Sequence, residues 1–170
     1  MVNIRTQTAR HSAQAGRVRH TRLSLAPVRP GPGWPDTRPG WPSSAATRAY
    51  REDQAGLRRF AAEQARMRGL GESRVLDLMI AVGELGGNTL RHTSGAGTLA
   101  LWATDDEIIC QIQDGGWIKD PLAGKTCPDP GALGGGRGLW IVHQLCDQVE
   151  MRSGPSGTTF RLHLRLRGTG

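Results

Sequence analysis

The hydrophobic period of this chain changes from helical to alternating about halfway along, and this change limits the fold more than any other feature. Apolar residues recur at helical spacing across residues 45–68 and again across residues 73–92. Residues 98–104 and 108–114 then alternate apolar and polar side chains around a short acidic turn, which predicts a β-hairpin. The chain therefore places two helices before its first pair of strands.

A second group of elements follows near the C-terminus. Residues 137–146 have the apolar content of a short helix, and residues 148–152 and 158–166 predict two further strands around a turn that contains Gly and Pro. Because consecutive hairpins and grouped helices favour an antiparallel sheet with helices on one face, we predict an α+β two-layer sandwich. Its antiparallel or mixed sheet is expected to have about four to five strands, with about three helices on one face.

The limits of the two long helices are predicted from their end signals. Ser43 or Ser44 can cap the first helix, which we expect over residues 45–68. The second helix is expected to begin near Ser73 and to end near His92. The side chains at helical spacing are Leu57, Phe60, Ala61, Gln64 and Met67 in the first helix, and Val75, Leu78, Met79, Val82 and Leu85 in the second.

Basic charge is concentrated before the predicted domain. Residues 1–50 contain eight Arg and one Asp, whereas residues 51–170 contain 14 Lys and Arg against 14 Asp and Glu. Residues 1–43 are also rich in Pro and Gly and lack an apolar period, so we expect a disordered basic tail before a folded domain at residues 44–167. The tail either has no specific role or is a basic arm that contacts nucleic acid or an acidic partner. The domain is neutral, so its charge gives no reason to expect nucleic-acid binding.

Composition also argues against several classes of protein. The three cysteines are odd in number and none is spaced as Cys-x-x-Cys, which argues against a disulfide framework or a zinc site and favours a reducing compartment. No apolar run approaches the roughly 18 residues of a membrane span, and the N-terminus lacks the apolar stretch of a secretory signal. We therefore expect a cytoplasmic protein that does not span a membrane.

Polar residues at four-residue spacing mark one face of the second helix. Glu84, Asn88 and His92 share that face, and Gly86 and Gly87 lie between the first two of them. A glycine inside a helix costs roughly 1 kcal/mol relative to Ala, so we expect a ligand or a neighbouring element to approach the backbone there. Taken alone, this pattern is more typical of a solvated helix face.

Two glycine-containing segments border a long irregular loop at residues 115–136. Asp114-Gly115-Gly116 ends a predicted strand, where a carboxylate can accept a hydrogen bond from an exocyclic amine, although the same triplet is common in plain turns. Residues 134–138, Gly-Gly-Gly-Arg-Gly, lead straight into the third helix. Glycine N–H groups beside a helix N-terminus form a phosphate cradle. Such a long loop inside a small domain is usually functional.

Two other phosphate-binding motifs are excluded. The glycines at residues 134–138 are not a dinucleotide fingerprint, because a loop rather than a strand precedes them. Gly124-Lys125-Thr126 is not the end of a P-loop, because Lys119 stands where that motif requires Gly. We interpret Lys125 as part of a lid.

In their order along the chain, these motifs resemble those of a known superfamily. Glu-x-x-x-Asn on a helix, Asp-x-Gly after a hairpin, a lid, Gly-x-Gly-Leu before a helix and Gly-Thr-Thr at the last strand are similar to the ATPases that include gyrase B, bacterial sensor histidine kinases and mismatch-repair ATPases. The similarity covers about residues 44–166. Within the superfamily, the chain resembles the stand-alone anti-sigma-factor serine kinases most closely. The resemblance implies a Bergerat-type ATP-binding fold that takes ATP and Mg²⁺.

The resemblance also implies roles for individual residues. Asn88 would give its amide oxygen to Mg²⁺, and Glu84 would be the general base that takes a proton from a serine hydroxyl or from water. Asp114 would bond the adenine amino group, with Gly116 beneath the ring. The other residues implied to surround ATP are Arg91, His92, Gly134, Gly135, Gly136, Arg137, Gly138, Leu139, Thr158 and Thr159.

Some positions refine or depart from the superfamily pattern. Thr158 or Thr159 is expected to support Asp114, directly or through water. Ile118 stands where relatives often have Gly, which predicts a looser loop beside the adenine. His143 lies among apolar residues of the third helix, so we interpret it as structural rather than as a phosphate acceptor.

The activity that the resemblance implies is that of an ATP-binding regulator of transcription. Such a protein would bind a sigma factor or an anti-sigma antagonist and phosphorylate the antagonist on Ser or Thr, and a homodimer is compatible with it. The alternatives are a non-catalytic ATP-sensing module of the same fold, a slow ATPase without a protein substrate, and a nucleic-acid-binding protein that acts through residues 1–43.

Overall fold

The computed structural model describes residues 40–120, 122–128 and 137–166 of the chain. Most of the predicted tail, residues 1–43, and part of the predicted lid, residues 115–136, lie outside these ranges. In the part of the chain that the structure describes, none of the helices combines the length and the apolarity needed to cross a membrane.

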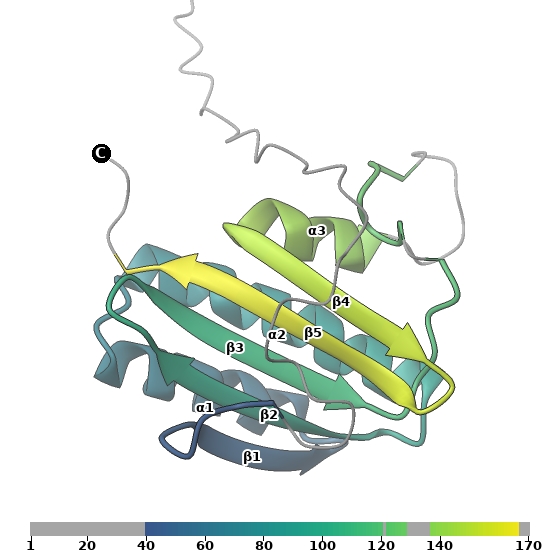
Figure 1. The fold of residues 1–170 in the computed structure, drawn as a ribbon, viewed down its shortest axis with the longest axis horizontal. Coiled ribbons are helices and arrows are strands. Elements are labelled where there is room, and N and C mark those ends of the chain that lie inside the picture. Colours follow the sequence, from purple (N-terminus) through teal and green to yellow (C-terminus); the bar gives the residue numbers. More distant parts are fainter. Residues whose placement is uncertain (1–39, 121, 129–136, 167–170) are drawn as a thin grey trace, which may run out of the picture.

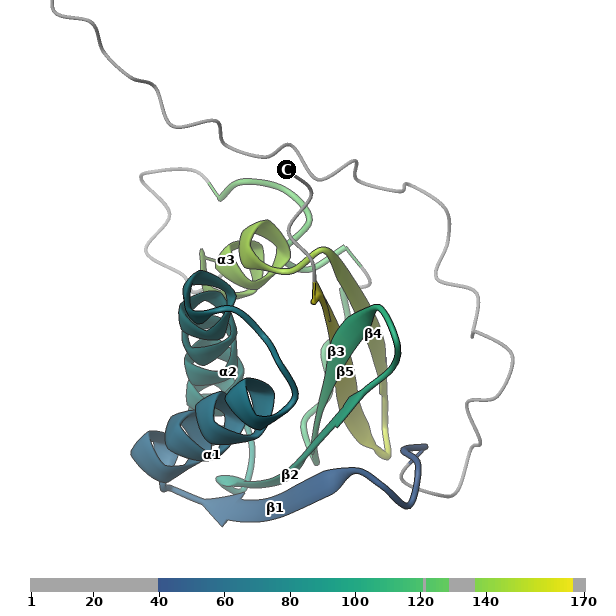
Figure 2. The ribbon, with the colours of Figure 1, turned by 90° about the vertical axis from the view of Figure 1, so that its left-hand side faces the viewer.

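Within these ranges, five antiparallel strands form one sheet in the order β1-β2-β3-β5-β4. The strands are β1 (Ala46–Arg51), β2 (Ala96–Ala103), β3 (Glu107–Asp114), β4 (Gln148–Gly154) and β5 (Gly157–Arg165). Both predicted hairpins are present, β2–β3 and β4–β5. The described part of the chain has three helices, and Figures 1 and 2 show that they lie on one face of this sheet, which confirms the predicted α+β two-layer sandwich.

The helices are α1 (Gln54–Met67), α2 (Glu72–His92) and α3 (Arg137–Leu145). The prediction of a single helix over residues 45–68 was wrong, because its first part is strand β1 and the helix begins only at Gln54. Asp53, and not Ser43 or Ser44, caps α1, since its carboxylate accepts a hydrogen bond from the Gly56 N–H at 2.7 Å. Between strand and helix, Glu52 has a φ of 59°, a left-handed conformation that turns the chain.

The main core lies between the helices and the inner face of the sheet. The predicted apolar stripe of α2 is confirmed, except that Met79 is only partly buried. In α1, Met67 is the last residue of the helix and is 72% exposed. Fully buried side chains that join the two layers include Leu57, Leu78, Val82, Leu85, Leu99, Leu101, Ile112 and Leu162.

A close helix–helix approach accounts for one of the two adjacent glycines of α2. A Cβ atom at Gly86 would lie 3.1 Å from Cδ2 of Leu57 in α1, which is tighter than an ordinary contact. The glycine therefore lets α1 and α2 pack closely over the sheet. Of the two predicted causes for a glycine here, a ligand or a neighbouring element near the backbone, the structure shows the second.

The outer face of the sheet carries a smaller apolar cluster. Trp41 and Ala45, which precede β1, pack against Trp102 and its neighbours on β2 and β3. Arg161 of β5 donates a hydrogen bond to the Gly40 carbonyl oxygen at 2.6 Å and lies 5.6 Å from the centre of the Trp102 ring. Residues 40–45 are thereby held against the side of the sheet opposite the helices.

A histidine between two carboxylates joins three strands on the same outer face. His163 Nδ1 lies 3.0 Å from Glu107 Oε1, and His163 Nε2 lies 3.6 Å from Glu150 Oε1, the latter being an ion-pair distance rather than a hydrogen bond. Burial lowers the pKa of His163, but the adjacent carboxylates of Glu150 and Glu107 outweigh it and the pKa is raised overall. The same contact with His163 lowers the pKa of Glu150.

We predict that this cluster stabilises the fold in a pH-dependent way. Because the folded-state pKa of His163 is raised, its contribution is fully present below its unfolded pKa of about 6.5 and is lost as pH rises through the folded value. A His163→Gln variant should therefore lose more thermal stability at about pH 5.5 than at about pH 9. Melting curves of both proteins at the two pH values provide the check, and an equal loss at both would contradict the prediction.

Candidate functional site

Two neighbouring ridges of α2 point to different surroundings. The ridge of Leu85, Thr89 and Thr93 faces the sheet, where Thr89 is fully buried. Glu84, Asn88 and His92 each precede one of these residues, so their ridge is turned by about 100° around the helix axis. Glu84 and Asn88 are half-buried, whereas His92 is exposed at the helix end.

Asp114, the last residue of β3, is held by a hydrogen-bond donor at each carboxylate oxygen. Its Oδ2 accepts from the Thr89 hydroxyl at 2.6 Å, and its Oδ1 accepts from the Gly116 N–H at 2.8 Å. The Asp114 side chain is thus fixed between α2 and the start of the loop that follows β3. Its remaining lone pairs can accept a further hydrogen bond from a ligand.

Gly116 occupies a place where a side chain would collide with α2. A Cβ atom there would lie 2.7 Å from Cγ2 of Thr93 and 3.0 Å from Asp114 Oδ1. Its carbonyl oxygen accepts a hydrogen bond from the Thr158 hydroxyl at 2.8 Å. Asp114, Gly116 and Thr158 therefore form one group at this end of the sheet, consistent with the pairing of Asp114 with Thr158 between β3 and β5.

The loop after Gly116 is tied to the β4–β5 hairpin, so the prediction that Ile118 loosens it was wrong. The Ile118 N–H donates to the Ser153 hydroxyl oxygen at 2.7 Å, and that hydroxyl lies 2.6 Å from the Thr158 hydroxyl. The Ile118 side chain also packs against the main core. A glycine would have more conformational freedom at this position. At Ile118 the hydrogen bond and the apolar contact together hold the loop in place.

The two threonines that were alternatives for supporting Asp114 lie on opposite faces of β5. Thr158 shares the inner face with Phe160 and is buried, whereas Thr159 alternates with it and shares the outer face with Arg161. The structure therefore brings Thr158 to Asp114 and places Thr159 on the side away from the helices.

Glu84 meets the first turn of α3. A Cβ atom at Gly138 would lie 2.5 Å from Glu84 Oε2, so the glycine lets the carboxylate come this close to α3. Arg137, the first residue of α3, is exposed. The predicted phosphate-binding residues Gly134, Gly135 and Gly136 lie outside the described residues, directly before this turn.

Part of the predicted lid packs against α3. Gly124 has a φ of +78°, and a Cβ atom there would lie 2.5 Å from Cβ of Leu139. Burial lowers the pKa of His143 in α3, and the nearby positive charge of Lys125 lowers it further. His143 is half-buried, in agreement with its structural interpretation.

Asn88 contributes an oxygen to the half-buried ridge beside Glu84. Its Oδ1 accepts a hydrogen bond from Arg91 Nη2 at 2.9 Å, and the guanidinium of Arg91 lies against Gly87. Among the described residues, no group of three or more His, Cys, Asp or Glu is placed to hold a metal ion. A metal at this position would therefore depend on Asn88, water and oxygens of a ligand.

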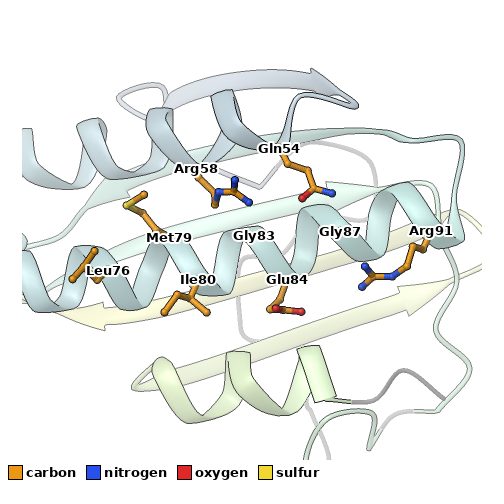
Figure 3. Close-up of a pocket in the computed structure, with 9 residues that line it drawn as sticks. All are labelled: Gln54, Arg58, Leu76, Met79, Ile80, Gly83, Glu84, Gly87 and Arg91. Carbon is orange, nitrogen blue, oxygen red and sulfur yellow. The ribbon is translucent and has the colours of Figure 1, made fainter. Parts of the chain in front are cut away.

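A shallow hollow of about 450 Å³ runs along the exposed side of α2. Figure 3 shows Gln54 and Arg58 of α1 above it, while Glu84 points from α2 towards α3. The Arg58 side chain lies over Gly83, where a Cβ atom would be 3.2 Å from Arg58 Cδ. Leu76 and Ile80, which are 56% and 49% exposed, line the same hollow. Glu84 therefore borders both this hollow and the N-terminus of α3.

Three residues of the site were missed by sequence reasoning: Thr89, Ser153 and Tyr50, whose hydroxyl lies 2.9 Å from the Thr89 hydroxyl. Thr89 follows Asn88 directly and lies four residues after the buried Leu85, a spacing that could have placed it on the sheet-facing ridge. Ser153 lies in β4 but in a segment that the sequence predicts as a turn, and Tyr50 lies in a strand predicted as helix, so neither gave a comparable signal.

Comparison with known proteins identifies the family to which this chain belongs. The model of the histidine kinase-like ATPase domain family matches residues 47–164, which include all five strands except the ends of β1 and β5, and all three helices. No curated protein matches the chain at a significant level. Since the match covers well over half of the chain, the protein belongs to the histidine kinase-like ATPase domain family, and this membership supports the binding of ATP.

Proposed function

We propose that this domain is an anti-sigma-factor-like serine/threonine kinase, which binds ATP with Mg²⁺ and phosphorylates an anti-sigma antagonist. The observation that carries the proposal is the position of Glu84. Its carboxylate lies beside the first turn of α3, where phosphates are expected, and at the edge of the hollow that is open to a partner. A base in this place is near both reactants.

The two ends of ATP would occupy two parts of the site. Asp114 presents carboxylate oxygens that can accept a hydrogen bond from the amino group of adenine, and Gly116 is the residue expected beneath the flat ring. The N-terminus of α3, which carries partial positive charge, suits the phosphates. The adenine part borders Thr93, the residue directly after α2, and the phosphate part borders Glu84 of α2.

The residues present are compatible with Mg²⁺. This ion prefers oxygen ligands and usually keeps several waters while it binds phosphates, so one amide oxygen from the protein is sufficient. Asn88 would supply that oxygen and Arg91, which now donates to it, would turn to the phosphates. The ion would neutralise charge that develops on the phosphate oxygens.

The transfer step follows from these positions. The carboxylate of Glu84 takes the proton of a partner's serine or threonine hydroxyl as the hydroxyl oxygen bonds to the γ-phosphorus. The bond from the γ-phosphorus to the β–γ bridging oxygen breaks at the same time, and ADP leaves with that oxygen. The protein mainly provides position and charge stabilisation.

The hollow beside Glu84 has the chemistry of a surface for an acidic partner segment. Leu76 and Ile80 offer exposed apolar side chains, while Arg58, which lies over Gly83, offers positive charge next to Glu84. Apolar contact with a flanking ion pair is typical of peptide recognition by a groove. A segment that carries Asp or Glu near its Ser or Thr would fit this pattern.

The direct test of the proposed kinase activity is incubation of the full chain with labelled ATP, Mg²⁺ and candidate antagonist proteins. Transfer of label to Ser or Thr of an antagonist supports the kinase. If ATP binds but no label reaches any candidate antagonist, the proposal is wrong, and the chain is then an ATP-sensing module. Steady phosphate release without an antagonist would identify a plain ATPase.

Charge reversal in the hollow should separate partner binding from ATP binding. An Arg58→Glu variant is expected to lower the rate of transfer to an acidic antagonist by at least about tenfold, because like charges then face each other. Its ATP affinity should be unchanged. Arg59→Glu is the matched control, since Arg59 is the exposed neighbour on α1 that does not line the hollow. Equal effects of the two variants would contradict the assignment of this surface.

A further inference from the structure

Behind Asp114 lies a buried chain of two hydroxyl groups. The Tyr50 hydroxyl of β1 lies 2.9 Å from the Thr89 hydroxyl of α2, which lies 2.6 Å from Asp114 Oδ2 at the end of β3. Thr89 is fully buried and Tyr50 is 6% exposed, so solvent does not compete for these groups. Three elements that are distant in sequence thus meet at one carboxylate.

The number of available protons fixes which group donates each hydrogen bond between Tyr50, Thr89 and Asp114. An ionised carboxylate can only accept hydrogen bonds, so Thr89 must donate its one proton to Asp114 rather than to the Leu85 carbonyl at 3.2 Å. Thr89 then has only lone pairs to offer to Tyr50, and Tyr50 must be the donor. Burial raises the pKa of Tyr50, which keeps its proton in place.

The backbone leaves room for this arrangement at one glycine. A Cβ atom at Gly97 of β2 would lie 2.6 Å from the Tyr50 hydroxyl oxygen and 2.7 Å from the Gln113 carbonyl oxygen. A larger residue would therefore push the Tyr50 ring away from Thr89. The hydroxyl chain depends on a glycine in the strand next to it.

We propose that the Tyr50–Thr89 chain determines base specificity, because it keeps Asp114 as a pure hydrogen-bond acceptor. Thr89 donates to one carboxylate oxygen of Asp114, and Gly116 donates to the other. A proton on either oxygen would therefore face one of these two donors, so Asp114 offers a ligand only acceptor oxygens. The site therefore accepts a purine with an amino group at C6 and rejects one with an oxo group there. This inference rests on the proposed placement of ATP, and it makes Thr89 and Tyr50 positioning residues that act through Asp114.

The experiment compares ATP with ITP, which differs by an oxo group in place of the C6 amino group. Calorimetry on the full chain should show that ATP binds at least about tenfold more tightly than ITP, because the oxo group would meet the carboxylate without a proton between them. Thr89→Val removes the hydroxyl and keeps the shape, and it should reduce the ATP to ITP ratio by about tenfold. Tyr50→Phe should reduce the ratio in the same direction, and Thr89→Ser should restore it.

Controls separate this inference from folding and from ATP binding itself. Thr104→Val, which removes a hydroxyl from the exposed turn between β2 and β3, should leave the ratio unchanged. If Thr89→Val does not fold, Tyr50→Phe carries the same test. If the wild type binds ATP but the variants keep its full ratio of ATP affinity to ITP affinity, the hydroxyl-chain inference is wrong and the proposed function is unaffected. Wild-type protein that binds neither nucleotide would overturn the proposed function as well.

Discussion

Replacement of Asp114 by Asn should weaken ATP binding by about 100-fold while the domain stays folded. The side chain keeps its shape, but one of its two acceptor oxygens becomes an NH₂ group. Two donors, the Thr89 hydroxyl and the Gly116 N–H, already require both positions, and the adenine amino group would add a third. The NH₂ group of Asn must then face one of these donors. Loss of a hydrogen bond to a charged group costs about 1.5–3 kcal/mol.

Calorimetric titration of the Asp114→Asn variant with Mg²⁺ and ATP measures this effect. Gln113→Ala is a suitable control, because Gln113 is the preceding residue of β3 and is exposed. The control should bind ATP as the wild type does. Unchanged affinity in Asp114→Asn would show that the adenine does not contact this carboxylate.

Replacement of Glu84 by Gln should lower the rate of phosphate transfer by about 100- to 10,000-fold, the usual contribution of a general base. Gln fills the same space beside Gly138 but cannot take the proton from the attacking hydroxyl. ATP affinity should change little, because no part of the nucleotide is expected to need the charge of Glu84. Single-turnover transfer from labelled ATP to an antagonist gives the rate, and a binding titration gives the affinity.

The matched control is Glu63→Gln, which removes a carboxylate from the exposed side of α1. Its transfer rate should equal that of the wild type. If Glu84→Gln transfers phosphate at the wild-type rate, Glu84 is not the base. If it loses ATP binding to the same extent as transfer, Glu84 contributes to nucleotide binding instead.

The elements with a long, regular period were predictable from sequence. Helix α2 spans 21 residues, and its apolar positions mark the buried stripe without ambiguity. Both hairpins follow from alternation around short turns, so the two-layer arrangement could be deduced from the order of elements. Local patterns were sufficient because each of these elements buries one continuous face.

Strand β1 could not be predicted, because its residues favour a helix and its pairing is distant. The sequence Ala-Thr-Arg-Ala-Tyr-Arg contains good helix formers, and Tyr50 is its only buried residue. It forms a strand because it pairs along the edge of β2, where Ala46 lies opposite Leu101. Tertiary pairing overrides helix propensity here. Asp53, three residues before Gly56, was the local signal for the later start of α1.

The candidate site could be predicted in part for the same reason. Glu84, Asp114, Gly116 and Gly138 belong to short motifs, and the structure brings Glu84 to Gly138 and Asp114 to Gly116. The supporting contacts join residues far apart in the sequence. Thr89 contacts Asp114, which lies 25 residues away in the sequence, and Tyr50, which lies 39 residues away. No local sequence pattern predicts such contacts.

The most direct test of the account is a titration of the isotope-labelled full chain with Mg²⁺ and a non-hydrolysable ATP analogue, followed by amide NMR. The account predicts that the resonances of Gly116 and Gly138 shift together, with one binding curve, since one nucleotide would reach from Asp114 to the N-terminus of α3. Arg165, at the far end of β5, should not shift. No shift at either glycine with the analogue at about 1 mM, or a shift at only one of them, would contradict a common nucleotide site.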